Sequence, residues 1–211
     1  MNPSVEAYMR ELQAHHDEPV LLEMEAHARE HNFPIVGRLV GVTLEVLARS
    51  IGARRVVELG SGFGYSGYWF SRAIGSEGEL HLTDDDEANA VKAADYLGRA
   101  GLDGPVEFHV GDAVTTLGTL ADDFDVVYND IDKEGYPDAW RAARDRIRVG
   151  GLYVCDNVLW YGSVTGETGD DRRPKATKSI MEHNRLIADD ADYLSTIVPT
   201  RDGVMVGLRL R

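Results

Sequence analysis

The residues of this chain that could do chemistry gather where apolar stretches end. The run VVYNDIDKEGY begins as a β-branched strand and reaches Asp130, Asp132 and Lys133 within its last residues. The next such stretch, GLYVCDN, ends with Asp156 and Asn157. Because consecutive strand ends lie at one edge of a parallel sheet, Asp130, Asp156 and Asn157 should converge there. Oxygen ligands without thiolate or imidazole suit Mg²⁺ best, with Ca²⁺ or Mn²⁺ as alternatives.

A glycine-rich turn follows an earlier predicted strand, in VVELGSGFGYSGYWF. Glycines let the backbone approach a ligand, and the following helix N-terminus offers free N–H groups. A literal GxGxxG at Gly62, Gly64 and Gly67 would suggest a dinucleotide, but it starts two residues after Gly60, which ends the strand. Glu58, inside the strand, would repel a pyrophosphate and would suit a cationic or amine-bearing ligand.

Two further strand ends complete the outline of a nucleoside site. Asp84 ends the second strand, where an acid can accept both hydroxyls of a ribose. Asp112 and Ala113 follow the third strand and could frame an adenine. S-adenosylmethionine, with an ammonium and a sulfonium in place of phosphate, fits this outline. The alternative is that Asp84 is a surface acid within DDDE and that Asp130 and Asp156 are ordinary polar strand ends.

The elements that would hold these residues alternate between strand and helix from residue 56 onward. Strands are predicted at 56–60, 79–84, 106–112, 124–130 and 151–157. Helical patterns lie between them at 64–75, 86–100, 113–121 and 136–148. This alternation needs crossover connections, so it predicts a mostly parallel sheet with helices on both faces.

The two ends of the chain depart from this alternation. YLSTIVPT and GVMVGLRLR are too close in sequence for a helical crossover and should form an antiparallel hairpin. Three helices are expected before the first strand, at 3–13, 19–31 and 36–50. The predicted fold is therefore α/β, a seven-stranded Rossmann-like sheet with one reversed C-terminal strand and extra N-terminal helices, with 1–211 as a single domain.

Composition indicates a cytoplasmic protein and excludes some partners. No apolar run approaches the ~20 residues of a membrane span, and the N-terminus lacks a secretory-signal pattern. The single cysteine, Cys155, cannot form an internal disulfide. A net charge of −14 argues against binding nucleic acid. Since lysine supplies only four of 22 basic residues, the source is either a halophile or an organism with ordinary acidic proteins.

ELGSGFGYS, DIDK and GGLYVCDNVLWYGSV, in this order and spacing, resemble motifs of the cation-dependent O-methyltransferases, the group of caffeoyl-CoA and catechol O-methyltransferases. The resemblance runs from about residue 30 to the end, through EHNRLI and VPTRDGVMVGLRL. It implies a homodimeric enzyme that uses S-adenosylmethionine and a divalent cation to methylate a catechol-like hydroxyl. The rival hypotheses are an NAD(P)-dependent oxidoreductase on a similar sheet and a non-catalytic nucleoside-binding module.

The resemblance also implies a role for each matching residue. The cofactor site would comprise Asn32, Glu58, Gly60, Ser61, Ser66, Asp84, Asp112, Ala113 and Asp130. The pattern around Asn32, HNFPIVGRL, departs from the usual one in the family. Asp130, Asp156 and Asn157 would hold the metal, Lys133 would be the general base, and Asp132 would support them.

The same resemblance locates the acceptor pocket. Helices within 1–52 and the long polar loop 161–175 would build it, and Trp160 would be either an aromatic beside it or a core tryptophan. Arg172, Arg173 and Lys175 could meet an anionic acceptor such as a coenzyme A thioester, or could be solvated loop charges. A small catechol is the preferred acceptor.

Overall fold

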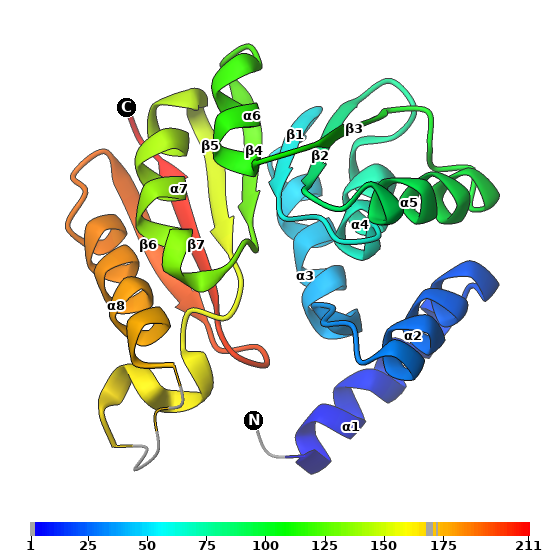
Figure 1. Ribbon diagram of the computed structural model, residues 1–211, viewed down its shortest axis with the longest axis horizontal. Helices are drawn as coiled ribbons and strands as arrows, with labels where there is room; N and C mark the ends of the chain where they lie inside the picture. The colour runs from blue at the N-terminus through cyan, green and yellow to red at the C-terminus, as the bar shows by residue number, and fades with distance from the viewer. Residues whose placement is uncertain (1–2, 168–170, 172) are drawn as a thin grey trace.

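The computed structural model describes residues 3–167, 171 and 173–211, and its centre is one seven-stranded sheet. The strands lie in the order β3-β2-β1-β4-β5-β7-β6 (Figure 1). Their bounds are β1 Arg55–Leu59, β2 Glu79–Asp84, β3 Val106–Val110, β4 Phe124–Asn129, β5 Ile147–Cys155, β6 Tyr193–Val198 and β7 Val204–Arg209. The first five strands pair in parallel, whereas β7 is antiparallel to both β5 and β6. The predicted fold class, with its single reversed strand, is confirmed.

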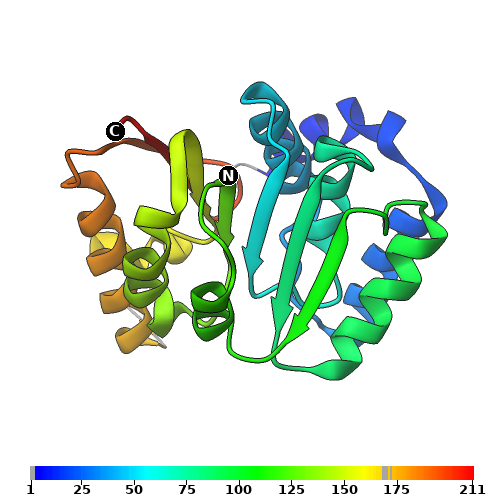
Figure 2. The same ribbon diagram turned by 90° about the horizontal axis from the view of Figure 1, so that it is seen from above.

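Helices cover the sheet on both faces (Figure 2). One face carries α3 Gly37–Ser50, α4 Tyr65–Ile74 and α5 Glu87–Arg99. The other carries α6 Ala113–Thr119, α7 Tyr136–Ala143 and α8 Pro174–Ala188. The N-terminal helices α1 Pro3–Leu12 and α2 Pro19–His31 lie outside the first layer. Short 3-10 helices cover Ala14–His16, Lys133–Gly135, Arg144–Arg146 and Trp160–Thr165.

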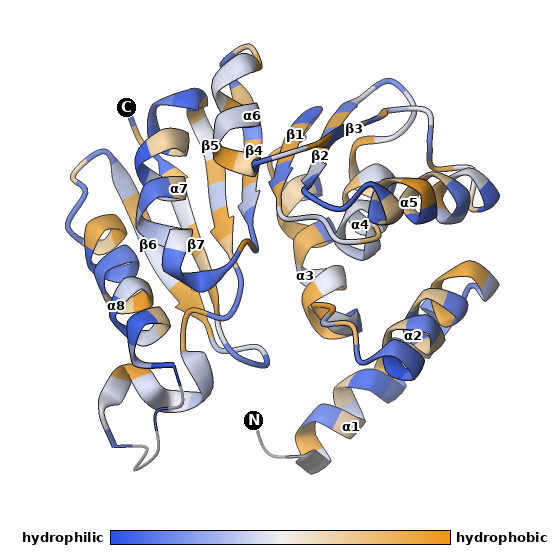
Figure 3. Cartoon of the chain, viewed as in Figure 1, coloured by the Kyte–Doolittle hydropathy of each residue, from blue (hydrophilic) through white to orange (hydrophobic). Residues whose placement is uncertain are grey.

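The core is divided by the sheet, as expected for strands buried on both faces. In β1, Val56 packs on the α4 side while Val57 and Leu59 pack on the α7 side. All six residues of β4, the central strand, are buried. Helices α2 and α8 alternate between hydrophilic and hydrophobic colours (Figure 3), and each buries one side against the rest of the chain, which is typical of amphipathic helices. Among the described residues, no helix is long and apolar enough to cross a membrane.

Two expectations about the chain after residue 136 are wrong. The helix expected over 136–148 ends at Ala143, and β5 already begins at Ile147, which is fully buried and pairs with Phe124. Glycines conceal this strand in the sequence, because they carry no β-branched or apolar side chain. At Gly151 a Cβ would lie 2.8 Å from the carbonyl oxygen of Asp125, so the close packing of β4 and β5 requires glycine there.

Helix α8 is not among the helices predicted from the sequence. It begins with Pro174 in its first turn, a position that suits proline because the missing N–H has no partner in a helix anyway. The polar loop predicted at 161–175 is thereby shortened at its end, and its start forms part of the 3-10 helix Trp160–Thr165. Residues 168–170 and 172 of that loop, including Arg172, lie outside the described residues.

Candidate active site

A cavity of about 1220 Å³ opens at the carboxyl ends of the parallel strands. Its lining includes every predicted site residue except Glu58: Asn32, Gly60, Ser61, Ser66, Asp84, Asp112, Ala113, Asp130, Lys133, Asp156 and Asn157. Ligands of open α/β sheets bind outside the carboxyl ends of the strands. The cavity therefore lies where the strand order predicts a site, and the side chains named from sequence line it together.

The glycine turn after β1 is in contact with the exit of β4. Gly60 has φ +83°, and a Cβ on it would lie 2.8 Å from the carbonyl oxygen of Asp130. Ser61 fastens the same turn to β2, because its backbone N–H donates to the Thr83 carbonyl at 2.7 Å and its hydroxyl accepts from the Thr83 N–H at 3.0 Å. The turn thus packs directly against the acidic strand end and is hydrogen-bonded to β2.

Glu58 lies beneath the cavity rather than in its wall. Its side chain is fully buried, and the Ser66 hydroxyl, at the start of α4, donates to its Oε1. Its Oε2 has no hydrogen-bond partner, and burial raises the pKa of Glu58 to about 8. A cation nearby would offset this desolvation and stabilise the ionised form of Glu58. Ser66 connects this carboxylate to the cavity.

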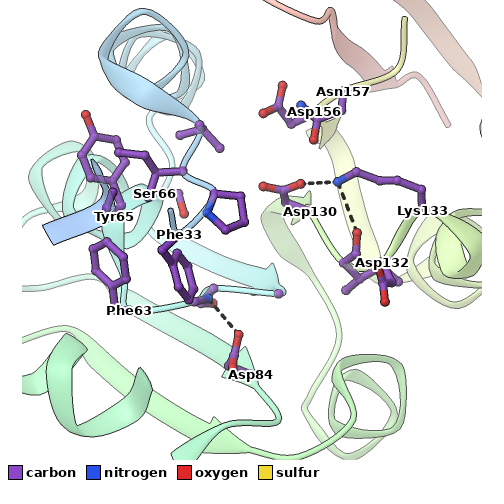
Figure 4. A pocket seen from close by; sticks show the side chains of 18 of the residues that line it. Phe33, Phe63, Tyr65, Ser66, Asp84, Asp130, Asp132, Lys133, Asp156 and Asn157 are labelled. Carbon is purple, nitrogen blue, oxygen red and sulfur yellow. Dashed lines mark hydrogen bonds and ion pairs between the residues drawn. The ribbon is translucent and has the colours of Figure 1, made fainter. Parts of the chain in front are cut away.

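Three of the predicted cofactor residues have visible structural roles. The Asp84 carboxylate accepts from the Gly62 N–H at 2.9 Å (Figure 4), as well as from the Asp86 N–H and the Asn89 amide. Asp112 caps α6 by accepting from the Thr115 N–H at 2.7 Å, and hydrogen bonds from the Thr115 side chain and backbone lower the pKa of Asp112. Asn32 ends α2 in the left-handed conformation, with φ 51°. Each of the three also lines the cavity.

The acidic strand ends converge as the parallel topology predicts. Figure 4 shows Asp130, Asp156 and Asn157 directed toward one another, with the Lys133 amine reaching between the strand ends. Lys133 Nζ donates to Asp130 Oδ1 at 2.7 Å and to the Ile131 carbonyl at 3.3 Å. The Lys133 side chain is only 12% exposed, and Nζ lies 5.0 Å from the centre of the Tyr136 ring. The amine is therefore fixed at the cavity wall.

The donor set fits a divalent cation. Asp156 is 2% exposed, and its Oδ1 has no hydrogen-bond partner. Burial raises the pKa of Asp156, and the negative charge of the neighbouring Asp130 raises it further. Burial also raises the pKa of Asp130. Lys133 pairs with Asp130 only. Asp156 Oδ1 therefore remains buried and unpaired beside the Asn157 amide. Carboxylate and amide oxygens are the ligands that hard cations prefer.

Asp132, by contrast, turns away from this group. Its side chain is 91% exposed, and its nearest charged partner is Arg173, with Nη2 at 3.6 Å from Oδ1. The support it gives comes from its backbone, since its carbonyl accepts from the Gly135 N–H at 2.9 Å and so closes the turn that carries Lys133. The side chain itself has no part in holding Lys133.

The cavity wall also contains residues that sequence reasoning did not identify. Arg201, in the turn between β6 and β7, donates to the Ile35 carbonyl at 2.9 Å and also to the Val36 carbonyl. It lines the cavity, and its charge opposes the rise in the pKa values of Asp130 and Asp156. No local signal in TRDG distinguishes such an arginine from an ordinary turn residue.

A second group on this wall comes from the N-terminal helices. Tyr65 donates through its hydroxyl to Glu25 Oε1 at 2.8 Å, and Arg38 donates to the same oxygen at 3.2 Å. Glu25 on α2, Arg38 on α3 and Tyr65 on α4 all line the cavity. Trp160 lines it too, half-buried against the core on the α7 side, with the Arg173 guanidinium 5.9 Å from the ring centre.

Comparisons with known proteins agree with this site. The model of the O-methyltransferase family matches residues 6–210. A catechol O-methyltransferase of Niastella koreensis is 32% identical over 98% of this chain and 92% of its own length. A catechol O-methyltransferase of Mycobacterium tuberculosis is 33% identical over 86% of this chain and 84% of its own length.

A solved structure extends the agreement to the whole fold. The O-methyltransferase TomG of Streptomyces achromogenes, involved in tomaymycin synthesis and solved in complex with SAM, is 30% identical. It superimposes with a TM-score of 0.88 over 99% of this chain and 96% of its own. The resemblance inferred from the motifs is thus confirmed: this chain belongs to the O-methyltransferase family.

Proposed function

We propose that this protein transfers the methyl group of S-adenosylmethionine to one hydroxyl of a catechol-like acceptor, with a divalent cation, Mg²⁺ in the first place, at Asp130, Asp156 and Asn157. The observation that carries the proposal is the pair of carboxylates beside Lys133, the half-buried Asp130 and the buried Asp156, next to the glycine turn. The catechol O-methyltransferases among the relatives support this acceptor class.

The cofactor would lie across the glycine turn. Its ammonium end would face Ser66 and the buried Glu58, whose Oε2 lacks a partner. The ribose would meet Asp84: its Oδ2 accepts a single N–H, from Gly62, and so keeps room for a hydroxyl. The adenine would lie beside Asp112 and Ala113, at the start of α6.

Lys133 would remove the proton from the acceptor hydroxyl. A free phenol has a pKa near ~10 and is a poor nucleophile at neutral pH. A divalent cation held by Asp130, Asp156 and Asn157 would lower that pKa. Lys133 is held at the cavity wall by Asp130 and the Ile131 carbonyl, so its amine is positioned before the acceptor arrives. A general base of this kind is worth about 10²–10⁴-fold in rate.

The N-terminal helices and the chain around Trp160 would hold the acceptor. Trp160 offers a flat apolar surface, and Arg173 lies over it at 5.9 Å, beside Asp132. A planar phenol can stack on such a ring, and the arginine would meet an acid group on the acceptor. A caffeate-like acid is accordingly the acceptor that this wall fits best.

The test is methyl transfer from S-adenosylmethionine to caffeic acid, with Mg²⁺ and with chelator, at low and at molar KCl. We expect turnover only with the metal, and greater activity in molar KCl if the acidic surface reflects a halophilic source. Equal turnover in chelator would contradict the metal-dependent mechanism. A thermal shift with NAD(P) and none with S-adenosylmethionine would favour the oxidoreductase instead, which the family assignment disfavours.

A further inference from the structure

Three potential metal ligands meet on the edge of the sheet, outside the active site. His81 on β2 lies opposite Glu107 on β3, and His109 follows two residues later on the same face of β3. His81 faces the α6–α7 side, because its neighbours Leu80 and Leu82 pack in the core on the other face. Nδ1 of His81, Nε2 of His109 and the Glu107 carboxylate all lie within 4.8 Å of one another. Figure 2 shows β3 beside β2 at this edge.

The spacing of these atoms matches a metal centre. Tetrahedral ligands about 2.1 Å from a zinc ion lie about 3.4 Å apart. Here the two ring nitrogens are 3.0 Å apart, and the Glu107 oxygens lie 3.6 Å from His81 Nδ1 and 3.8 Å from His109 Nε2. An ion would therefore enter with small side-chain movements. No backbone change is needed, because the register of β2 and β3 already aligns the three residues.

The surroundings orient the buried ligand. His81 is 3% exposed, and its far nitrogen Nε2 donates to Glu79 Oε1 at 2.6 Å. The other oxygen of Glu79 accepts from Arg55 Nε at 3.0 Å. With its proton on Nε2, His81 directs the lone pair of Nδ1 toward His109 and Glu107. A carboxylate bound to the far nitrogen of a histidine is the usual outer partner in protein metal sites.

Without metal, the two histidines satisfy each other. His81 Nδ1 has a lone pair, so His109 must donate its Nε2–H across the 3.0 Å contact. Metal binding would move that proton to His109 Nδ1 and place the ion between the two rings. The Glu107 side chain is 67% exposed, which leaves the site open to solvent on one side. A water molecule can therefore take the fourth position.

We propose that His81, His109 and Glu107 form a second cation site, specific for a transition metal such as Zn²⁺, which ties the edge strand β3 to β2. Imidazole ligands select Zn²⁺ and related ions over Mg²⁺. The active centre instead presents carboxylate and amide oxygens at the ends of β4 and β5. The two sites thus differ in both place and ligand chemistry.

The experiment is titration of the chelator-treated full chain with Zn²⁺ and Co²⁺, followed by calorimetry, by Co²⁺ absorption and by thermal unfolding. The test variants are His109→Ala and Glu107→Gln, both at partly exposed positions. We expect them to weaken binding at this site by at least about tenfold and to abolish the Zn²⁺-induced rise in Tm. Glu79→Gln should cost about 10–100-fold in affinity, as the loss of an outer partner does.

Two controls separate this site from the other cation ligands of the chain. Asp156→Ala removes a carboxylate of the active centre. His31→Ala removes one member of a separate histidine pair on α2, His27 and His31, whose ring centres are 4.2 Å apart. Both should keep the Co²⁺ band and the Tm shift. Loss of binding in either control but not in His109→Ala would overturn the proposal. The absence of Zn²⁺ binding to the unmodified chain would overturn it as well.

Discussion

Substitution of Gly60 by alanine tests the contact between the glycine turn and the backbone that carries Asp130. Gly60 has φ +83°, and its Cβ would meet the Asp130 carbonyl oxygen at 2.8 Å and the Ile131 Cα at 3.0 Å. The left-handed conformation costs about 1–2 kcal/mol for a residue with a Cβ. The clash is with backbone rather than with a flexible side chain, and overpacking of this kind costs about 1–3 kcal/mol more.

Gly52→Ala is the matched control. Gly52 also has a left-handed backbone, with φ +63°, but nothing lies within 4 Å of its Cβ position. We expect this variant to lose only the conformational part, about 1–2 kcal/mol. Gly60→Ala should lose about 2–5 kcal/mol in total. It should also lose methyl-transfer activity, because the exit of β4 must shift and Asp130 moves with it.

The assay is urea unfolding followed by tryptophan fluorescence, with turnover measured on the same preparations. Linear extrapolation gives the free energy of unfolding of each variant. Equal losses of stability in the two variants, together with unchanged turnover in Gly60→Ala, would refute the contact between the turn and Asp130. If Gly60→Ala loses more stability than Gly52→Ala but keeps its turnover, the contact between Gly60 and Asp130 exists but does not position the active centre.

Three further predictions concern single groups. Lys133→Ala should keep S-adenosylmethionine binding, measured by calorimetry, and lose about 10²–10⁴-fold in turnover, whereas the exposed Lys178→Ala should change neither. Asp156→Ala combined with Asn157→Ala should abolish Mg²⁺-dependent turnover, and full activity in chelator would contradict it. Burial lowers the pKa of His183 to about 4, so stability should be lost as pH falls from 6.5 to 4. In urea unfolding at several pH values, His183→Gln should reduce that loss by up to about 3 kcal/mol, and an unchanged pH profile would contradict the assignment.

Much of the active centre is predictable because it depends on local order and on strand direction. A parallel sheet places successive strand ends at one edge, so Asp130, Asp156 and Asn157 had to approach one another. Lys133 follows Asp130 by three residues in a tight turn, which brings amine and carboxylate within 2.7 Å. The alternation of strands and helices likewise determined the parallel part of the sheet and its two faces, and the short connection between β6 and β7 determined the reversed strand.

Other predictions stay open because they depend on what lies outside one chain. The homodimer, the halophilic source and the cytoplasmic location rest on resemblance or on composition. A net charge of −14 fits both a halophilic source and an ordinary acidic protein. Which phenol is the natural acceptor likewise depends on shape complementarity with the wall around Trp160.

The direction and burial of individual side chains were decided only by the tertiary structure. Glu58 and Asp132 are both acidic residues within the motifs ELGSGFGYS and DIDK, yet Glu58 is fully buried and bonded to Ser66, whereas Asp132 points into solvent. Arg201 reaches the cavity because the β6–β7 turn packs against Ile35, far away in sequence. Strand pairing and helix formation depend on patterns along the chain, whereas burial depends on which distant segments come to lie against a residue.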